Sequence, residues 1–176
     1  MCASKTDPDE PRYKSPLENH GKHVRAIGMI TIENSSLEVL FGDLLGVILG
    51  VKPDIGIALF FSPKAAIARL DLITNTLPLI YRDGDPVRSR IEKLVSRSRA
   101  VMGKRHEIIH ALWAENEVPG EPVVSKISFP KWSGGPVGIQ DLYAIIKTYR
   151  EIIKDMLDLF NDLQPLSDED REFLEP

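Results

Sequence analysis

The chain has 176 residues, of which 43% are apolar and 27% charged, and its formal net charge is −4. This size and composition fit one globular domain with its own core and exclude an intrinsically disordered chain. The single cysteine, Cys2, excludes an internal disulfide and a cysteine-based zinc site. The apolar stretches are too short to span a bilayer and the N-terminus has no signal-peptide pattern, so we expect a cytoplasmic protein with no membrane partner.

The first part of the chain predicts a tail followed by one long helix. Residues 1–21 are rich in proline and charge, and we expect them to be flexible. A helix is predicted over 22–49, where apolar residues recur at helical spacing. Gly50 is a suitable stop and Pro53 favours a break. The apolar residues that follow, up to Phe61, are expected to be irregular.

The second predicted helix has a favourable N-terminal pair. Ser62 can act as N-cap and Pro63 can occupy the first helical position. Ala66 and Ile67 then belong to the predicted inward face, together with Leu70, Ile73 and Leu77. Pro78 should kink or end this helix, because its ring blocks a backbone hydrogen bond.

A third helix is predicted to begin with Asp85-Pro86, after a turn at Asp83-Gly84, and to run to about Trp113. Its inward face contains mostly apolar residues. One member of that face, Arg105, is a cation, and an unpaired cation in this position would be costly. We therefore expect Arg105 to have a partner, and Glu38 on the first helix is the obvious candidate.

The helical period disappears between 114 and 138. The alternating segment 123–129 predicts a short strand or hairpin arm, and 133–136 is expected to be a loop. A last helix is predicted over 139–163, followed by an acidic tail over 164–176. The predicted fold class is therefore all-α. It is a bundle of four to five helices over 22–163, with a short β-hairpin or arm before the last long helix.

Positive charge is concentrated in the third predicted helix, although the whole chain is acidic. Residues 86–106 contain seven cations and one anion, Glu92, which gives a local charge of +6. Such an element can bind phosphates, or it can be a solvated helix face that pairs with acids elsewhere. The seven cations are Arg88, Arg90, Lys93, Arg97, Arg99, Lys104 and Arg105.

One motif at the end of this helix is typical of zinc metallopeptidases. His106-Glu107-x-x-His110 places two imidazoles on one helix face, with a glutamate as general base. A catalytic zinc needs a third protein ligand, and Asn116 stands where the extended motif has a histidine. The cations Lys104 and Arg105 would also repel a dication. We expect no metal or other cofactor, and the zinc enzyme remains the lesser alternative.

A second interpretation of the same segment takes Arg105 and His110 as an R-x4-H pair, with the polar His106 directly after the arginine. With a first helix that contains Gly28 and the step Leu37-Glu38, the chain resembles the HEPN superfamily over roughly 24–163. In many relatives an asparagine follows the arginine and a glycine follows the histidine, whereas this chain has His106 and Ala111.

The resemblance implies a metal-independent endoribonuclease that works as a homodimer, with two copies of the site facing a shared cleft. Such domains commonly serve in toxin–antitoxin systems, which makes an antitoxin a possible partner. The residue types fit this chemistry. His110 can take the proton of a 2′-hydroxyl or position it, Arg105 can stabilise the phosphate, and His106 can assist.

Other residues are expected to bind the RNA substrate. Arg97 and Lys104 would follow the RNA backbone, and Trp113 or Trp132 could stack on a base. In the alternative function the chain is a catalytically inactive HEPN-like scaffold, in which Arg105 and Glu38 form a structural ion pair. His20 and His23 are expected to be exposed and without a role.

Overall fold

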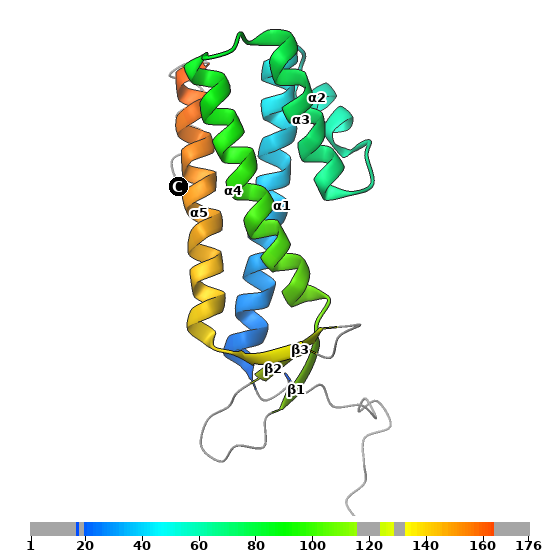
Figure 1. Ribbon diagram of the computed structural model, residues 1–176, viewed down its shortest axis with the longest axis vertical. Helices are drawn as coiled ribbons and strands as arrows, with labels where there is room; N and C mark the ends of the chain where they lie inside the picture. Colours follow the sequence, from blue (N-terminus) through cyan, green and yellow to red (C-terminus); the bar gives the residue numbers. More distant parts are fainter. Residues whose placement is uncertain (1–16, 18–19, 116–123, 129–132, 164–176) are drawn as a thin grey trace, which may run out of the picture.

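Three long helices, α1, α4 and α5, run along the length of the computed structural model, and two shorter helices, α2 and α3, lie beside one end (Figure 1). A small sheet lies at the other end. This arrangement confirms the expected all-α bundle. The structure describes residue 17 and residues 20–115, 124–128 and 133–163. The elements are α1 (Gly21–Leu49), α2 (Pro53–Phe61), α3 (Ala66–Ile80), α4 (Pro86–Ile109), β1 (Leu112–Glu115), β2 (Val124–Ser128), β3 (Ser133–Val137) and α5 (Ile139–Leu163).

Helices α1 and α5 form the centre of the bundle, and both have the predicted extents to within one residue. The α1 helix ends where Gly50 adopts the left-handed conformation (φ 63°), which releases the chain from the helix. The two helices bury an apolar stripe against each other and against α4. The largest fully buried side chains of α1 and α5 are Ile30, Leu37, Phe41, Leu44, Leu45, Leu142 and Tyr149.

The prediction of irregular chain before Phe61 is wrong, because these residues form α2. Pro53 occupies the first turn of this helix, where its missing N–H costs nothing. The axis turns by 117° between α1 and α2, and the two helices cross through glycines. A Cβ built on Gly56 would lie 2.4 Å from the backbone nitrogen of Gly46, so only glycine permits this approach.

The start of α3 also differs from the prediction. Ser62 ends α2 and donates its hydroxyl hydrogen bond to the Ala58 carbonyl (2.9 Å), so it does not cap the next helix. Helix α3 begins at Ala66, and both Ala66 and Ile67, which were predicted to be inward, are exposed. The other three residues of the predicted stripe, Leu70, Ile73 and Leu77, are buried. Pro78 lies in the last turn, two residues before the helix ends.

Helix α4 begins as predicted and ends earlier. The Asp85 carboxylate accepts hydrogen bonds from the backbone N–H of Val87 (2.7 Å) and of Arg88 (3.3 Å), which caps the helix. The helix stops at Ile109, and His110 is its C-cap residue. The predicted extension to Trp113 is wrong because the chain enters β1, which pairs with β2.

The sheet has the order β1-β2-β3 with antiparallel pairing throughout. The predicted strand is β2, whereas 133–136, expected to be a loop, belongs to the edge strand β3. An imidazole nitrogen of His23 lies 3.2 Å from the Val137 carbonyl, which fastens the end of β3 to α1. His20 and His23 are only 9% and 7% exposed, so the expectation that they are exposed is wrong.

Among the described residues, no single helix combines the length and apolar character needed to cross a membrane. Helices α1 and α2 meet that criterion only together, as a pair bent by 117°. Apart from residues 17, 20 and 21, the N-terminal tail predicted over 1–21 lies outside the described residues, as does the acidic tail over 164–176.

Candidate functional site

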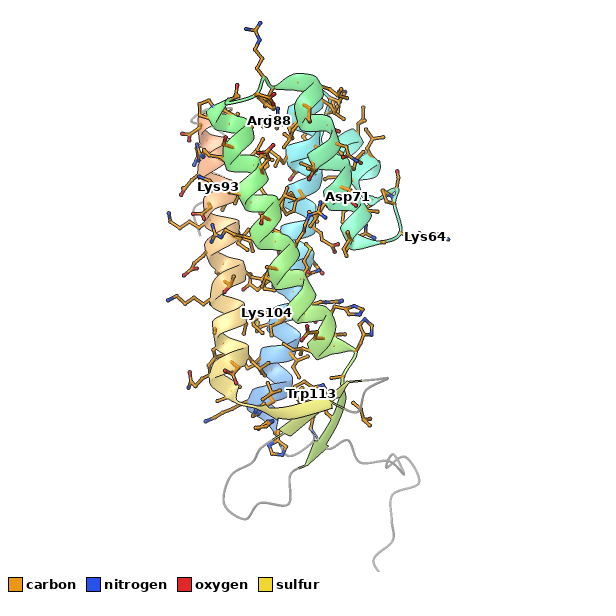
Figure 2. All side chains as sticks on the ribbon, viewed as in Figure 1. Lys64, Asp71, Arg88, Lys93, Lys104 and Trp113 are labelled. Atoms are coloured by element: carbon orange, nitrogen blue, oxygen red, sulfur yellow. The ribbon has the colours of Figure 1, made fainter. Side chains whose placement is uncertain are left out.

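A pocket of about 620 Å³ opens between the middle of α1, the start of α3 and the C-terminal half of α4. Helix α1 contributes Asn34 and Glu38, and α4 contributes residues between Arg99 and His106. The third wall is the segment that joins α2 to α3 and the first turn of α3, where Lys64 projects from the ribbon (Figure 2). Three elements that are distant in sequence therefore form one concave surface.

The helical register of α4 explains which of its residues face the pocket. Arg99, Gly103, His106 and His110 follow one another at steps of four, three and four, so they share one face of the helix. Arg105 lies beside this stripe, between the pocket and the core, and is half-buried. The structure therefore brings two of the predicted catalytic residues, Arg105 and His106, into the same pocket.

His110 does not line the pocket, but it lies next to a residue that does. Its ring centroid is 4.5 Å from that of His106, and the two rings are tilted by 49°. Both side chains are exposed, and His110 is the last residue before the chain leaves the helix. The three predicted catalytic residues therefore form one continuous group at the sheet end of α4.

Arg105 does not form the ion pair that the sequence predicts. The Glu38 carboxylate accepts instead from the guanidinium of Arg69 on α3, at 2.8 Å. No ion pair within the described residues engages Arg105, and its Nε is buried without a hydrogen-bond partner. A buried donor without a partner costs free energy in the protein without ligand. Because Arg105 also lines the pocket, the exposed part of its side chain is placed to meet a ligand acceptor there.

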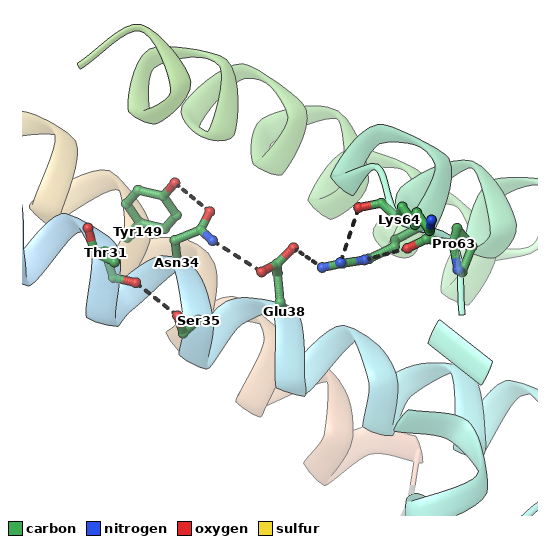
Figure 3. A network of polar contacts seen from close by, with 8 residues as sticks. Thr31, Asn34, Ser35, Glu38, Pro63, Lys64 and Tyr149 are labelled. Atoms are coloured by element: carbon green, nitrogen blue, oxygen red, sulfur yellow. Dashed lines mark hydrogen bonds and ion pairs between the residues drawn. The ribbon is translucent and has the colours of Figure 1, made fainter. Parts of the chain in front are cut away.

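Arg69 was missed by the sequence analysis, and it holds the third wall of the pocket in place. Its Nε donates to the Pro63 carbonyl at 2.9 Å and its Nη2 donates to the Lys64 carbonyl at 3.3 Å (Figure 3). Its guanidinium also lies 4.8 Å from the centroid of the Phe61 ring. With Glu38, these contacts tie the connection between α2 and α3 to the middle of α1.

The same network continues from Glu38 into the core (Figure 3). Asn34 donates to Glu38 at 3.3 Å, and the buried Tyr149 hydroxyl of α5 donates to the Asn34 amide oxygen at 3.0 Å. Burial is the main cause that raises the pKa of Tyr149; the charge of Arg105 opposes this rise and the charge of Glu38 adds to it. The phenol is therefore a neutral donor, close enough to Arg105 to feel its charge.

The pocket lining has a surplus of positive charge. Four cations, Lys64, Arg69, Arg99 and Arg105, face one anion, Glu38, which leaves a net charge of +3. Arg99 also pairs with Asp71 at 2.7 Å, from outside the pocket. The surplus is still +2 when this acid is counted. An anionic ligand is the natural occupant of such a surface.

The three expected RNA-binding residues lie outside this pocket. Arg97 is directed toward α5, where it pairs with Asp155, and Lys104 is exposed. Trp113 lies in β1, and its indole N–H donates to the Ile108 carbonyl at 3.2 Å, which anchors it at the junction of α4 and the sheet. Trp132 lies outside the described residues.

Some of the pocket residues that were not predicted could have been recognised from their spacing in the sequence. Arg99 precedes His106 by two helical turns, and Asn34 precedes Glu38 by one, so each pair was predictable as sharing a helix face. Arg69 had no such signal. Its position depends on where α3 begins, and the sequence favours a start three residues too early, at Pro63 instead of Ala66.

The described part of the chain contains two neighbouring imidazoles but no complete set of ligands for a catalytic zinc. His106 and His110 are close together. Within residues 20–115, 124–128 and 133–163, however, no three His, Cys, Asp or Glu side chains form a group that could hold a metal. A catalytic zinc site uses three protein ligands, so the third would have to come from elsewhere.

Comparison with protein-family models, curated proteins and solved structures finds no match to this chain. The likeness to the HEPN superfamily therefore remains a resemblance. It depends on the R-x4-H motif at Arg105 and His110 and on the pattern of the first helix.

Proposed function

We propose that this chain is a metal-independent endoribonuclease of the HEPN type, which cleaves RNA by attack of a 2′-hydroxyl on the adjacent phosphate. One observation carries the proposal. The half-buried Arg105, whose Nε has no partner among the described residues, shares a positively charged pocket with His106, and His110 lies against His106. This combination supplies a hydrogen-bond donor for the phosphate and two imidazoles for proton transfer within one group of residues.

Each residue has a role in the proposed reaction. His110 takes the proton of the 2′-hydroxyl, or positions that group, as the oxygen forms a bond to phosphorus. Arg105 donates hydrogen bonds to the phosphate oxygens, where negative charge develops. The bond from phosphorus to the 5′-oxygen breaks, and that oxygen accepts a proton with assistance from His106. The products are a 2′,3′-cyclic phosphate and a 5′-hydroxyl.

The chemistry needs few protein groups because RNA supplies its own nucleophile. The 2′-hydroxyl is already tethered beside the phosphate, so positioning contributes much of the acceleration. By resemblance, we propose that two copies of the chain dimerise, so that their sites face one cleft. An antitoxin that covers this cleft is the corresponding proposed partner.

The test is cleavage of a structured RNA in the presence of EDTA. We expect wild-type protein to cleave, and Arg105→Ala and His110→Ala to lose about a hundredfold or more in rate, as when one transition-state donor is removed. The matched control is Arg90→Ala on the same helix. Arg90 pairs with Asp162 of α5 and lies outside the pocket, so this variant should keep its rate within about twofold.

Three outcomes would contradict the proposal. Loss of cleavage in EDTA with recovery on adding zinc would support the metallopeptidase-type site instead. Equal cleavage by wild type and Arg105→Ala would mean that the activity does not come from this site. No cleavage at all would leave the inactive scaffold as the better description of the chain.

A further inference from the structure

We propose that the α3 side of the pocket is a subsite for the phosphate next to the scissile one, in which Arg99 binds that phosphate and Arg69 positions the wall behind it. The inference rests on the proposed function, because it assigns this region to a second nucleotide of the same RNA strand. It also makes Arg99 a binding residue beyond the R-x4-H motif.

The spacing of two arginines on α4 supports this assignment. Arg99 and Arg105 are six residues apart, which corresponds to about 9 Å along the helix axis. Both line the same pocket. Successive phosphates of an extended single strand are separated by one nucleotide, a distance that two long arginine side chains on one helix can bridge. If Arg105 contacts the scissile phosphate, Arg99 is in place for its neighbour.

Arg99 has donors left for a ligand. Its Nη2 group donates to Asp71 at 2.7 Å and lies 3.4 Å from the Thr74 hydroxyl. Within the described residues its Nε and Nη1 groups donate to no acceptor, and about a third of the side chain (34%) is exposed. A guanidinium carries five N–H donors, so one edge can hold Asp71 while the rest faces a phosphate.

Arg69 differs from Arg99 in this respect. Its three nitrogens all donate within the protein, to Glu38 and to the carbonyls of Pro63 and Lys64. It is also less exposed than Arg99, at 18%. Arg69 therefore fixes the shape of the wall rather than binding the ligand, and its positive charge adds to the field at the subsite.

The α3 side of the pocket also has an apolar surface for a nucleoside. Ile67 in the first turn of α3 is 66% exposed and lines the pocket beside Arg69. Met102 and Leu70 lie on the same lining. Apolar side chains next to a few placed polar groups are typical of small-molecule sites, and the face of a base fits such a surface.

The test measures how much one added phosphate strengthens binding. The ligands are a 2′-O-methyl dinucleotide, which cannot be cleaved by the proposed reaction, and the same dinucleotide with a 5′- or a 3′-phosphate. In wild-type protein, we expect one phosphorylated form to bind about tenfold more tightly in calorimetry, as a charge-assisted contact predicts. The gain should fall to about twofold or less in Arg99→Ala, because its phosphate contact is gone.

Two variants control this measurement. Arg90→Ala removes the same charge from the same helix and should keep the full gain, because Arg90 lies outside the pocket. Arg99→Gln keeps a donor for Asp71 and removes the charge, so it should lose the gain even if Arg99→Ala folds poorly. An equal loss in Arg90→Ala would overturn the subsite, since it would indicate general electrostatic attraction.

The binding result and the cleavage result separate the two proposals. A phosphate gain that depends on Arg99, in a protein that cleaves no RNA, would uphold the subsite and contradict the nuclease. Cleavage that depends on Arg105, without a gain from either added phosphate, would uphold the nuclease and overturn the subsite. Failure of all three dinucleotides to bind would also overturn the subsite.

Discussion

The arginines on the two faces of α4 differ in their partners. Toward α5, Arg90 pairs with Asp162 and Arg97 pairs with Asp155, so each cation has its own acid. Toward the pocket, Arg99 pairs with Asp71 but is partly exposed to solvent. The Nε of Arg105 has no partner in the described part of the chain. The local charge of +6 in the sequence therefore overstates the free charge and does not show on which face it lies.

The two faces of α4 also differ in what their arginines contribute to stability and to ligand binding. Ion pairs between exposed side chains, such as those toward α5, contribute little to the free energy of unfolding. A buried guanidinium nitrogen without an acceptor costs free energy, which proteins tolerate where a ligand binds. We therefore expect the α5 face of α4 to contribute little to either the free energy of unfolding or ligand binding. The pocket face should favour ligand binding and lower the stability of the protein without ligand.

The largest stability effect should come from Glu38, the acid that pairs with Arg69 at the pocket. Glu38→Ala leaves the mostly buried Arg69 without its acid and removes the acceptor of Asn34. We expect it to lower the free energy of unfolding by about 2 kcal/mol. Asp162, which is 63% exposed, is the matched acid on the other side. Asp162→Ala should cost about 0.5 kcal/mol or less in the same urea titration. Equal effects would contradict the comparison.

The core end of the pocket network should have the next largest effect. Tyr149→Phe removes the donor to Asn34 Oδ1 and leaves that buried oxygen unpaired. The expected loss in the free energy of unfolding is about 1.5 kcal/mol, measured by urea denaturation. Tyr143→Phe, at an exposed position of α5, is the control and should be neutral. A neutral Tyr149→Phe would mean that the network does not support the pocket.

The same variant has a predicted pH dependence. Burial raises the pKa of Tyr149 in the folded protein. The unfolded chain therefore loses this proton first, and wild-type stability falls as pH rises above about 10, the reference pKa of tyrosine. Tyr149→Phe lacks this contribution, so the stability difference between the two proteins should shrink in alkaline solution. A constant difference would show that the phenol titrates normally.

A smaller effect of opposite sign is expected at Arg105. Arg105→Met keeps much of the side-chain length and removes the unpartnered buried Nε. We expect this variant to be more stable than wild type by about 1 kcal/mol in thermal or urea unfolding, although it should not cleave RNA. Loss of stability would indicate that the guanidinium is already satisfied in the free protein.

The smallest expected effect is the coupling between Arg97 and Asp155. Because both side chains are about half exposed, a double-mutant cycle should give about 0.5 kcal/mol or less, and added salt should reduce it. Coupling well above this value would mean that the α5 face of α4 contributes more to stability than the comparison states.

The helices were most predictable where one local signal decided the outcome. The extent of α5 follows from a strong apolar stripe, and the start of α4 follows from the Asp85-Pro86 pair. In α2 all residues except Asp54 are uncharged and mostly apolar, so no helical period was visible. The packing of α2 depends on contact between Gly56 and Gly46. The sequence does not reveal such a contact before the helices are placed.

The strands were hard to predict because they form by pairing between segments that are separated in sequence. Leu112 and Trp113 continue the helical pattern of α4, yet they pair with Ile127 and Lys126 of β2. The glycines and Pro136 of β3 are typical of a loop, but an edge strand can accept them. In both places tertiary pairing overrides the local preference.

The pocket was predictable only in part. The spacing from Arg105 to His110 indicated which end of α4 to consider. Glu38 was expected to pair with Arg105, and it lines the same pocket but pairs with Arg69. Its partner was not predictable, because Arg69 reaches Glu38 only through the late start of α3. The position of an ion pair between helices depends on helix boundaries, which local signals define poorly.

The most direct test of the central claim is the chemistry of the RNA ends. A labelled RNA with a single 2′-O-methyl nucleotide at a mapped cleavage site is incubated with wild-type protein in EDTA. We predict 2′,3′-cyclic phosphate and 5′-hydroxyl ends at the other sites and no cut at the modified one, because the nucleophile is blocked there. Cleavage at the modified position, or products with 5′-phosphate ends, would contradict 2′-hydroxyl attack promoted by Arg105 and His110.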